Sequence, residues 1–337
     1  MKRNFDLRVL ILHWNRGRWT ANDMRESKKL CTGVERWVFA MDGDYCNTLE
    51  IKEKELLNYD IVILNSDINH PKYFRKICKL VENRPKGVTW ITLVEGDMSI
   101  YKPDKNLQKV FDNSDFVVCI NKYTKEFWEK FTKTKVEFIG VPYPVDEVRK
   151  LSIKTEKRLK QCIICPSLLI RYQDFLVARE LGIDMIGFEK RFSHKFKTVF
   201  KNRTLKRDFY LQKAEKIYQG NNLKILLEKS FEKYFNFTAN SFIMINLDNR
   251  YTWGRYVLDA AALQIPIITT ISTGHGLDLF PELCLDNENQ IEKAIEIGKR
   301  LIENKDFYEH VSNIPIEKLD IYKEDYMKKK LLKFINY

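Results

Sequence analysis

Residues 241–286 read SFIMINLDNRYTWGRYVLDAAALQIPIITTISTGHGLDLFPELCLD, and this stretch is the most informative part of the chain. The apolar run at 241–247 predicts a short strand that is buried on both faces of a sheet. After a polar loop, residues 253–263 predict a helix. Its apolar face is formed by Tyr256, Val257, Ala260 and Leu263.

A second buried strand is expected at 265–270, and the glycine-bearing turn Ser272-Thr-Gly-His-Gly276 follows it. The N-terminus of the preceding helix would face this turn. Such a helix end offers free backbone N–H groups and a partial positive charge, which suit a phosphate or diphosphate. The same pattern is also compatible with an ordinary βαβ unit that carries Asp259 on its surface.

The order of these elements resembles the donor site of GT-B glycosyltransferases, most of all the retaining family 4. A weaker likeness is to the phage DNA β-glucosyltransferase. Asp259 stands where family 4 has the glutamate that holds the nucleotide ribose, whereas Tyr251 replaces the other glutamate of the usual pair. The resemblance implies an α/β protein of two Rossmann-like, doubly wound domains with an interdomain cleft. It also implies a nucleotide-diphosphate sugar as co-substrate, with no bound cofactor and no metal.

The resemblance further implies cations beside the donor diphosphate, because the leaving group carries negative charge. Arg171 matches the lysine of the family, but Pro166 occupies the position of its arginine, so Arg250 or Arg255 would have to supply that charge. A surface salt bridge is the alternative for Arg171. The expected donor-binding residues are Arg171, Tyr251, Gly254, Arg255, Asp259, Thr273, Gly274 and His275.

Composition indicates a globular protein, with 44% hydrophobic and 31% charged residues among 337. The formal charge of +12 favours an anionic partner. Seven cysteines, an odd number, suggest reduced thiols and a cytoplasmic protein. Cys162-Ile-Ile-Cys165 lies in a predicted strand and favours a core position over a zinc or redox site. No signal peptide or membrane span is expected.

Apolar runs alternate with helical segments along the whole chain, which indicates parallel, doubly wound sheets. Helices are expected at 71–82, 124–132, 223–235, 290–303 and 321–335. Strands are expected at 8–14, 35–42, 60–66, 88–95, 116–121, 136–141, 161–167, 183–188 and 216–220.

The segment Gly140-Val-Pro-Tyr-Pro-Val-Asp146 interrupts this alternation, because its prolines continue neither a helix nor an interior strand. We therefore expect a first, acceptor-side domain at 1–143 and a second domain at 144–315, which binds the nucleotide sugar. The resemblance implies that the C-terminal helix, within 316–337, crosses back to the first domain.

Glu95 and Asp97 directly follow a predicted strand, and a carboxylate at such a strand tip suits a general base that takes the proton of an acceptor hydroxyl. A turn acid that caps the next segment is the alternative. The loop Asn15-Arg-Gly-Arg18 (Asn15, Arg16, Gly17 and Arg18) follows the first strand and is a candidate for the acceptor side. The five histidines show no metal-ligand spacing.

Residues 190–216 carry ten lysines and arginines against two acids, with phenylalanines at Phe192, Phe196 and Phe200. This segment suits an anionic bilayer, a nucleic acid, or a basic helix whose phenylalanines pack inward. The resemblance to GT-B enzymes implies that the chain is a metal-independent glycosyltransferase, and the acceptor is expected to be a glycan, a lipid-linked molecule at the membrane surface, or DNA. The alternatives are a DNA-modifying enzyme acting on a hydroxylated base, a non-catalytic binding protein on a GT-B scaffold, and a sugar-nucleotide epimerase.

Overall fold

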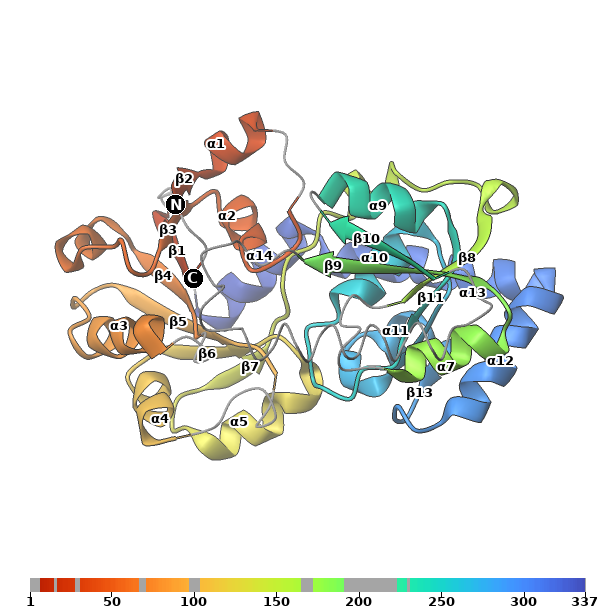
Figure 1. Cartoon of the computed structure of the whole chain (residues 1–337). Coiled ribbons are helices and arrows are strands. Elements are labelled where there is room, and N and C mark those ends of the chain that lie inside the picture. Colours follow the sequence, from red (N-terminus) through yellow and green to blue (C-terminus); the bar gives the residue numbers. More distant parts are fainter. Residues whose placement is uncertain are drawn as a thin grey trace, which may run out of the picture. The chain divides into compact units, whose positions relative to one another are not determined.

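The computed structural model describes residues 7–14, 17–27, 31–66, 71–96, 104–164, 172–190, 223–228 and 231–336. The chain divides into two compact units. The first unit comprises Met1–Pro144, Arg250–Trp253 and Asp320–Tyr337, and the second comprises Val145–Asn249 and Gly254–Leu319. Each unit contains one sheet with helices packed on it (Figure 1).

The sheet of the first unit has, among the described residues, the strand order β2-β3-β1-β4-β5-β6-β7. Every neighbouring pair is parallel except β2 and β3, which are antiparallel. The strands are β1 (Val9–His13), β2 (Arg18–Thr20), β3 (Asp44–Asn47), β4 (Ile61–Asn65), β5 (Thr89–Val94), β6 (Phe116–Cys119) and β7 (Val136–Phe138).

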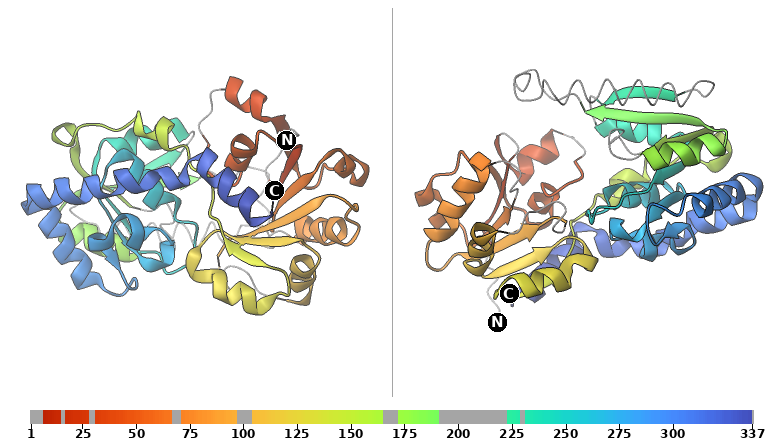
Figure 2. Two further views of the ribbon diagram at one scale, coloured as in Figure 1. Left: turned by 180° about the vertical axis from the view of Figure 1, so that it is seen from behind. Right: turned by 60° about the horizontal axis from the view of Figure 1, so that its bottom comes forward.

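Helices cover both faces of this sheet. Successive side chains of its strands point to opposite sides, and they are apolar on both sides, so each face packs against helices. Leu10 and Leu12 of β1 pack into one apolar cluster with α3, α4 and α5, whereas Val9 and Ile11 pack into another with α2 and α14. Figure 2 shows α14, in dark blue, beside this sheet. The helices of this unit are α1 (Ala21–Glu26), α2 (Arg36–Met41), α3 (Pro71–Glu82), α4 (Lys105–Asp112), α5 (Lys125–Phe131) and α14 (Glu324–Phe334).

The strand expected at 35–42 is wrong, because this segment forms the helix α2. A short apolar run is compatible with either structure, and only its burial decides. Trp37, Val38 and Met41 are buried on one helical face, and Asp42 ends the helix in the left-handed conformation with φ 51°. The adjacent strand of the sheet is formed instead by Asp44–Asn47.

The sheet of the second unit has the order β10-β9-β8-β11-β12-β13 among the described residues, and all its pairs are parallel. The strands are β8 (Leu159–Ile164), β9 (Asp184–Lys190), β10 (Leu223–Glu228), β11 (Ser241–Asn246), β12 (Ile267–Thr270) and β13 (Cys284–Leu285). The prediction of doubly wound parallel sheets is therefore confirmed in both units.

The helices of the second unit pack on its sheet in two groups. Helices α7 and α12 contact one another, and α10 contacts α6, α11 and α13. At the α7–α12 contact, Gly298 lets α12 approach Leu181 closely, since a Cβ at this position would lie 2.5 Å from the leucine side chain. The helices are α6 (Val145–Arg149), α7 (Tyr172–Glu180), α9 (Phe231–Ala239), α10 (Arg255–Leu263), α11 (Gly276–Leu279), α12 (Ile291–Glu303) and α13 (Lys305–Lys318).

The helix expected at 223–235 is also wrong, because this range contains a strand and the beginning of a separate helix. Residues 223–228 form β10, which pairs with β9 along the whole of its length, and α9 begins only at Phe231. Pairing with the open edge of β9 outweighs the helical periodicity of the segment. The strand expected at 216–220 lies outside the described residues.

Candidate functional site

The N-terminus of α10 lies directly against the turn that follows β12. Gly254 is the N-cap of α10 and has φ +70°, and a Cβ at this position would lie 2.0 Å from the carbonyl oxygen of Thr273 and 3.0 Å from the ring of His275. Only glycine fits such an approach. The structure therefore brings Gly254, Thr273 and His275 together at the carboxyl end of the second sheet.

Hydroxyl groups fix the shape of this turn. Thr270 and Ser272 both donate hydrogen bonds to the carbonyl oxygen of Asp248 in the loop after β11, and their own oxygens lie 2.8 Å apart. Thr273 Oγ1 donates to the carbonyl oxygen of Thr270 at 2.7 Å. The end of β12 thus holds the loop that leads from β11 toward α10, and Gly274 ends the short helical turn Ile271–Thr273.

Asp259 lies inside the second unit, at 0% exposure. Its Oδ2 accepts a hydrogen bond from the hydroxyl of Tyr234 at 2.8 Å and lies 3.5 Å from Nε of Arg255. Burial, followed by the Asp259 charge, raises the pKa of Tyr234 well above its ordinary value, so the phenol stays a hydrogen-bond donor. This carboxylate is held by protein groups rather than displayed at the surface.

Arg255 lies between Asp259 and several aromatic rings. Its guanidinium carbon is 4.8 Å from the ring centroid of Tyr256, 5.3 Å from that of Tyr234 and 5.6 Å from that of Phe231. These distances suit cation–π contacts. Arg255 is therefore well fixed beside the N-terminus of α10.

Tyr251 and Arg171 are the two remaining residues discussed for the donor site. Tyr251 belongs to the short segment Arg250–Trp253 of the first unit, where Nδ2 of Asn121 donates to the carbonyl oxygen of Thr252 at 2.6 Å. Arg171 lies outside the described residues.

The carboxyl edge of the first sheet carries a row of polar residues. Because β3, β1, β4 and β5 are neighbours in that order, the residues at their ends lie side by side. All but Glu95 of this row are buried. The row consists of Asn47, His13, Asn65 and Glu95. Sequence reasoning identified only Glu95, although a polar residue at the end of each apolar run was a usable signal.

His13 is the member of this row best suited to move a proton. Its side chain is buried, and Nδ1 lies 3.3 Å from the hydroxyl of Tyr45 and 3.4 Å from Oε1 of Glu35. Trp19 stacks on Tyr45 with ring centroids 3.9 Å apart, which fixes that phenol. A carboxylate beside one imidazole nitrogen orients the ring and leaves the other nitrogen for proton transfer.

The remaining acceptor-side residues are only partly described. Glu95 follows β5 directly and is half-buried, and Asp97, Asn15 and Arg16 lie outside the described residues. Gly17 has φ +111° and precedes β2.

Arg18 lies in β2, and its Nη1 donates to Oε1 of Glu55 at 2.7 Å. That hydrogen bond is the main reason why the pKa of Glu55 is lowered to about 2. Arg18 is therefore already engaged on the protein surface.

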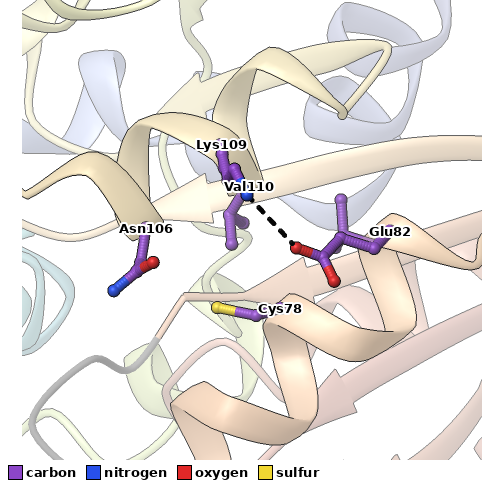
Figure 3. Close-up of a pocket in the computed structure, with 6 residues that line it drawn as sticks. Cys78, Glu82, Asn106, Lys109 and Val110 are labelled. Atoms are coloured by element: carbon purple, nitrogen blue, oxygen red, sulfur yellow. Dashed lines mark ion pairs between the residues drawn. The ribbon is translucent and has the colours of Figure 1, made fainter.

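Other features of the described residues point to no further catalytic group. No set of three metal-ligating side chains is found among them, and no helix in this part of the chain is long and apolar enough to cross a membrane. A hollow of about 10 Å³ between α3 and α4 has room for about one water molecule (Figure 3). It is lined by Cys78, Val81, Glu82, Asn106, Lys109 and Val110.

Comparison with known proteins gives a match at the level of structure. A scan of protein-family models finds no match to the sequence, and a search of curated proteins finds none either. Among solved structures, an alpha-glucosyltransferase in complex with UDP-glucose and DNA containing an abasic site is similar, with a TM-score of 0.59 and 12% identity over 98% of this chain and 99% of that chain.

Protein structures described as trehalose-6-phosphate or trehalose 6-phosphate synthase are similar as well. One from E. coli, bound with UDP-2-fluoro glucose, has a TM-score of 0.67 and 7% identity over 97% of this chain and 98% of that chain. A trehalose 6-phosphate synthase from Burkholderia multivorans has a TM-score of 0.63 and 8% identity over 86% and 71% of the two chains. The likeness to these glycosyltransferases, together with the two doubly wound sheets, shows that the chain has the GT-B fold.

Proposed function

We propose that the protein is a glycosyltransferase that moves a sugar from a nucleotide-diphosphate sugar to an acceptor hydroxyl. The observation that carries this proposal is the junction of α10 with the 271–275 turn. There a helix N-terminus at Gly254 lies against Thr273 and His275 at the carboxyl end of a parallel sheet. Backbone N–H groups and the positive end of the helix dipole at this place suit the diphosphate of the donor.

In this proposal Arg255 stabilises the negative charge that develops on the leaving diphosphate, and Asp259 positions it. Asp259 is fully buried and contacts Arg255 and Tyr234. It therefore acts on the donor through the guanidinium. Charge stabilisation of a leaving phosphate by a fixed cation is a large contribution to catalysis of group transfer. Arg171 and Tyr251 stay proposed donor ligands on the sequence resemblance alone.

The acceptor is proposed to bind at the carboxyl edge of the first sheet. The reaction needs a group that removes the hydroxyl proton as the new glycosidic bond forms. Glu95 and Asp97 are the candidates from the sequence. His13, held by Glu35 and Tyr45, is a further candidate that the structure adds.

Glu95→Gln is expected to lower kcat by about 10²–10⁴-fold while leaving the donor Kd unchanged. Glutamine keeps the shape and hydrogen bonding of the side chain but takes up no proton. The measurement is release of UDP from UDP-glucose in the presence of acceptor, together with calorimetry for donor binding. The matched control is Glu50→Gln, since Glu50 is exposed and follows β3 at the same edge.

The companion substitutions Asp97→Asn and His13→Gln assign the role. Loss of turnover in one of these variants, with Glu95→Gln fully active, would move the base to that residue. If all three variants turn over at the wild-type rate, none of these groups is the base. If the wild type itself binds no nucleotide sugar, the proposed function is wrong.

Asp259→Asn is expected to lower the free energy of unfolding by about 1.5–3 kcal/mol, because a buried charge-assisted contact is lost. It should also weaken binding of UDP-glucose through Arg255. Tyr234→Phe is the companion variant. It removes the hydroxyl that donates to the same buried carboxylate and should also cost about 1.5–3 kcal/mol, but it keeps the Asp259 charge beside Arg255. Urea unfolding followed by far-UV circular dichroism measures the free energy of unfolding of both variants. Unchanged stability in Asp259→Asn would contradict the assigned contact.

DNA is the acceptor class with specific support. One similar structure contains UDP-glucose together with DNA, and the chain carries a formal charge of +12. Affinity for duplex DNA should then fall steeply with salt, because phosphate contacts release counterions. Transfer of labelled glucose to a duplex with a hydroxymethylated base, but not to an unmodified duplex, tests this acceptor. The sequence suggests the segment 190–216 for contact with DNA or a membrane. Lys190 is the last residue of β9, and residues 191–216 lie outside the described residues.

A further inference from the structure

The second unit contains an open cavity of about 330 Å³ that no part of the proposed reaction uses. Its size is in the range of pockets that take small molecules, ~300–1,000 Å³. The lining is polar and consists of Arg149, Ser152, Ile153, Lys154, Thr155, Arg158, Gln264, Glu309, Ser312 and Asn313.

This cavity lies at the edge of the second sheet where its strands begin. The turn at 271–275, where the donor is proposed to bind, lies at the opposite edge. Arg158 directly precedes β8, and Gln264 ends α10 shortly before β12 begins. The proposed donor site is at the other end of the same helix, at Gly254. A ligand in the cavity would therefore bind separately from the nucleotide sugar.

Positive charge dominates the lining. Arg149, Lys154 and Arg158 supply three cations, and Glu309 is the acid among the lining residues. The Glu309 carboxylate lies 3.5 Å from the ammonium of Lys305, one turn earlier on α13, so its charge is partly compensated.

Two guanidinium nitrogens beside the cavity lack partners. Within the part of the chain that the structure describes, Nη2 of Arg149 and Nε of Arg158 are buried and have no hydrogen bond. An unsatisfied buried N–H of a charged group is costly. Both nitrogens are enclosed by protein, so an anion in the open cavity would be attracted by the charge of these arginines rather than bound by these two N–H groups.

Arg158 also explains why the end of α10 does not repel an anion. Its Nη1 and Nη2 donate to the carbonyl oxygens of Gln264 and Leu263, each at 2.9 Å, and Ser152 Oγ donates to Leu263 at 2.8 Å. These bonds satisfy the last carbonyls of the helix, which otherwise carry partial negative charge.

We propose that this cavity binds the phosphate group of a small phosphorylated molecule. Arginine N–H groups and a lysine ammonium are the usual partners of phosphate oxygens. The amides of Gln264 and Asn313 and the hydroxyls of Ser152 and Thr155 suit hydroxyl groups on the rest of such a ligand. The site is independent of the proposed sugar transfer.

The test is calorimetric titration of the full chain with inorganic phosphate and with glycerol 3-phosphate at constant ionic strength. Arg149→Gln with Lys154→Gln is expected to raise Kd for both about 100-fold, tenfold for each cation lost, where tenfold corresponds to about 1.4 kcal/mol. Asn313→Glu, at an exposed lining position, is expected to abolish binding by adding a carboxylate. Arg158 is left intact because it holds the end of α10.

The matched control is Lys150→Gln with Lys157→Gln, which removes the same charge from exposed positions of the same segment that do not line the cavity. This variant should bind phosphate like the wild type, and the Arg149/Lys154 variant should still bind UDP-glucose like the wild type.

An equal loss of phosphate affinity in both double variants would show a general charge effect and overturn the site. Binding of duplex DNA but not of either phosphate compound, lost in Arg149→Gln with Lys154→Gln, would also overturn it in favour of a nucleic-acid surface. No phosphate binding by the wild type would exclude it directly.

Discussion

Replacement of Gly254 by alanine is expected to lower the free energy of unfolding of the second unit by about 4 kcal/mol and to abolish nucleotide-sugar binding. The new Cβ would lie 2.0 Å from the carbonyl oxygen of Thr273, which is a backbone atom and has no rotamer to change. Overpacking costs about 1–3 kcal/mol, and the left-handed conformation at φ +70° adds about 1–2 kcal/mol for a residue with a Cβ.

Helix α10 has little freedom to move away from this clash. Its residues from Val257 to Leu263 are all buried, so a shift of the helix would disturb the core of the second unit. The turn after β12 is equally fixed, because Thr270 and Ser272 hold it to the loop carbonyl of Asp248.

Gly182→Ala is the matched control for this prediction. Gly182 also has a positive φ, of +63°, but a Cβ there would meet nothing within 4 Å, so it should cost only the conformational part, about 1–2 kcal/mol. The six tryptophans of the chain all fall in residues of the first unit, so far-UV circular dichroism in urea is the appropriate probe. Equal losses in the two variants would show that the approach of α10 to the turn is not tight.

The sequence predicted the central strands and the α10 junction because their signals are local. A parallel strand that is buried on both faces appears as a continuous apolar run, as at Ile61–Asn65 and Ser241–Asn246. Gly254 and the turn at 272–276 are separated by one helix and one strand. Their proximity therefore follows from a single βαβ-type connection.

The two secondary-structure errors depend on contacts between distant segments. Arg36–Met41 becomes a helix because its apolar side chains are buried against the sheet and α14, which is almost the full chain length away. Leu223–Glu228 becomes a strand because β9 has an open edge to pair with. The hydrophobic periodicity of a short segment does not reveal such contacts with distant segments.

The candidate site was predicted least well where it depends on strand order. His13, Asn47 and Asn65 come together only because β1 lies between β3 and β4, and this order is a tertiary property. The environment of Asp259 was missed for a related reason. Its partner Tyr234 comes from α9, and no motif links the two residues.

Glu324→Ala is expected to lower the free energy of unfolding of the first unit by about 3–5 kcal/mol, because it leaves the charge of Arg36 buried without its carboxylate. The Arg36 side chain is only 3% exposed, and its Nε donates to Oε1 of Glu324 at 2.6 Å while Nη2 contacts the same oxygen. Glu324 begins α14, whose Met327, Leu331 and Phe334 are buried in the core of the first unit. Loss of the pair therefore weakens the attachment of the whole C-terminal helix. Urea unfolding followed by tryptophan fluorescence reports on this unit specifically.

Asp325→Ala is the matched control, since Asp325 is an exposed acid in the same first turn of α14. It should cost only the interaction with the helix dipole, about 0.3–1 kcal/mol. The double substitution Arg36→Met with Glu324→Gln should recover most of the lost stability, because no buried charge then remains to be compensated. If the double variant is as unstable as Glu324→Ala, or if Asp325→Ala is equally damaging, the buried charge of Arg36 is not the cause. The stability of the first unit would then depend on the apolar contacts of α14 rather than on this ion pair.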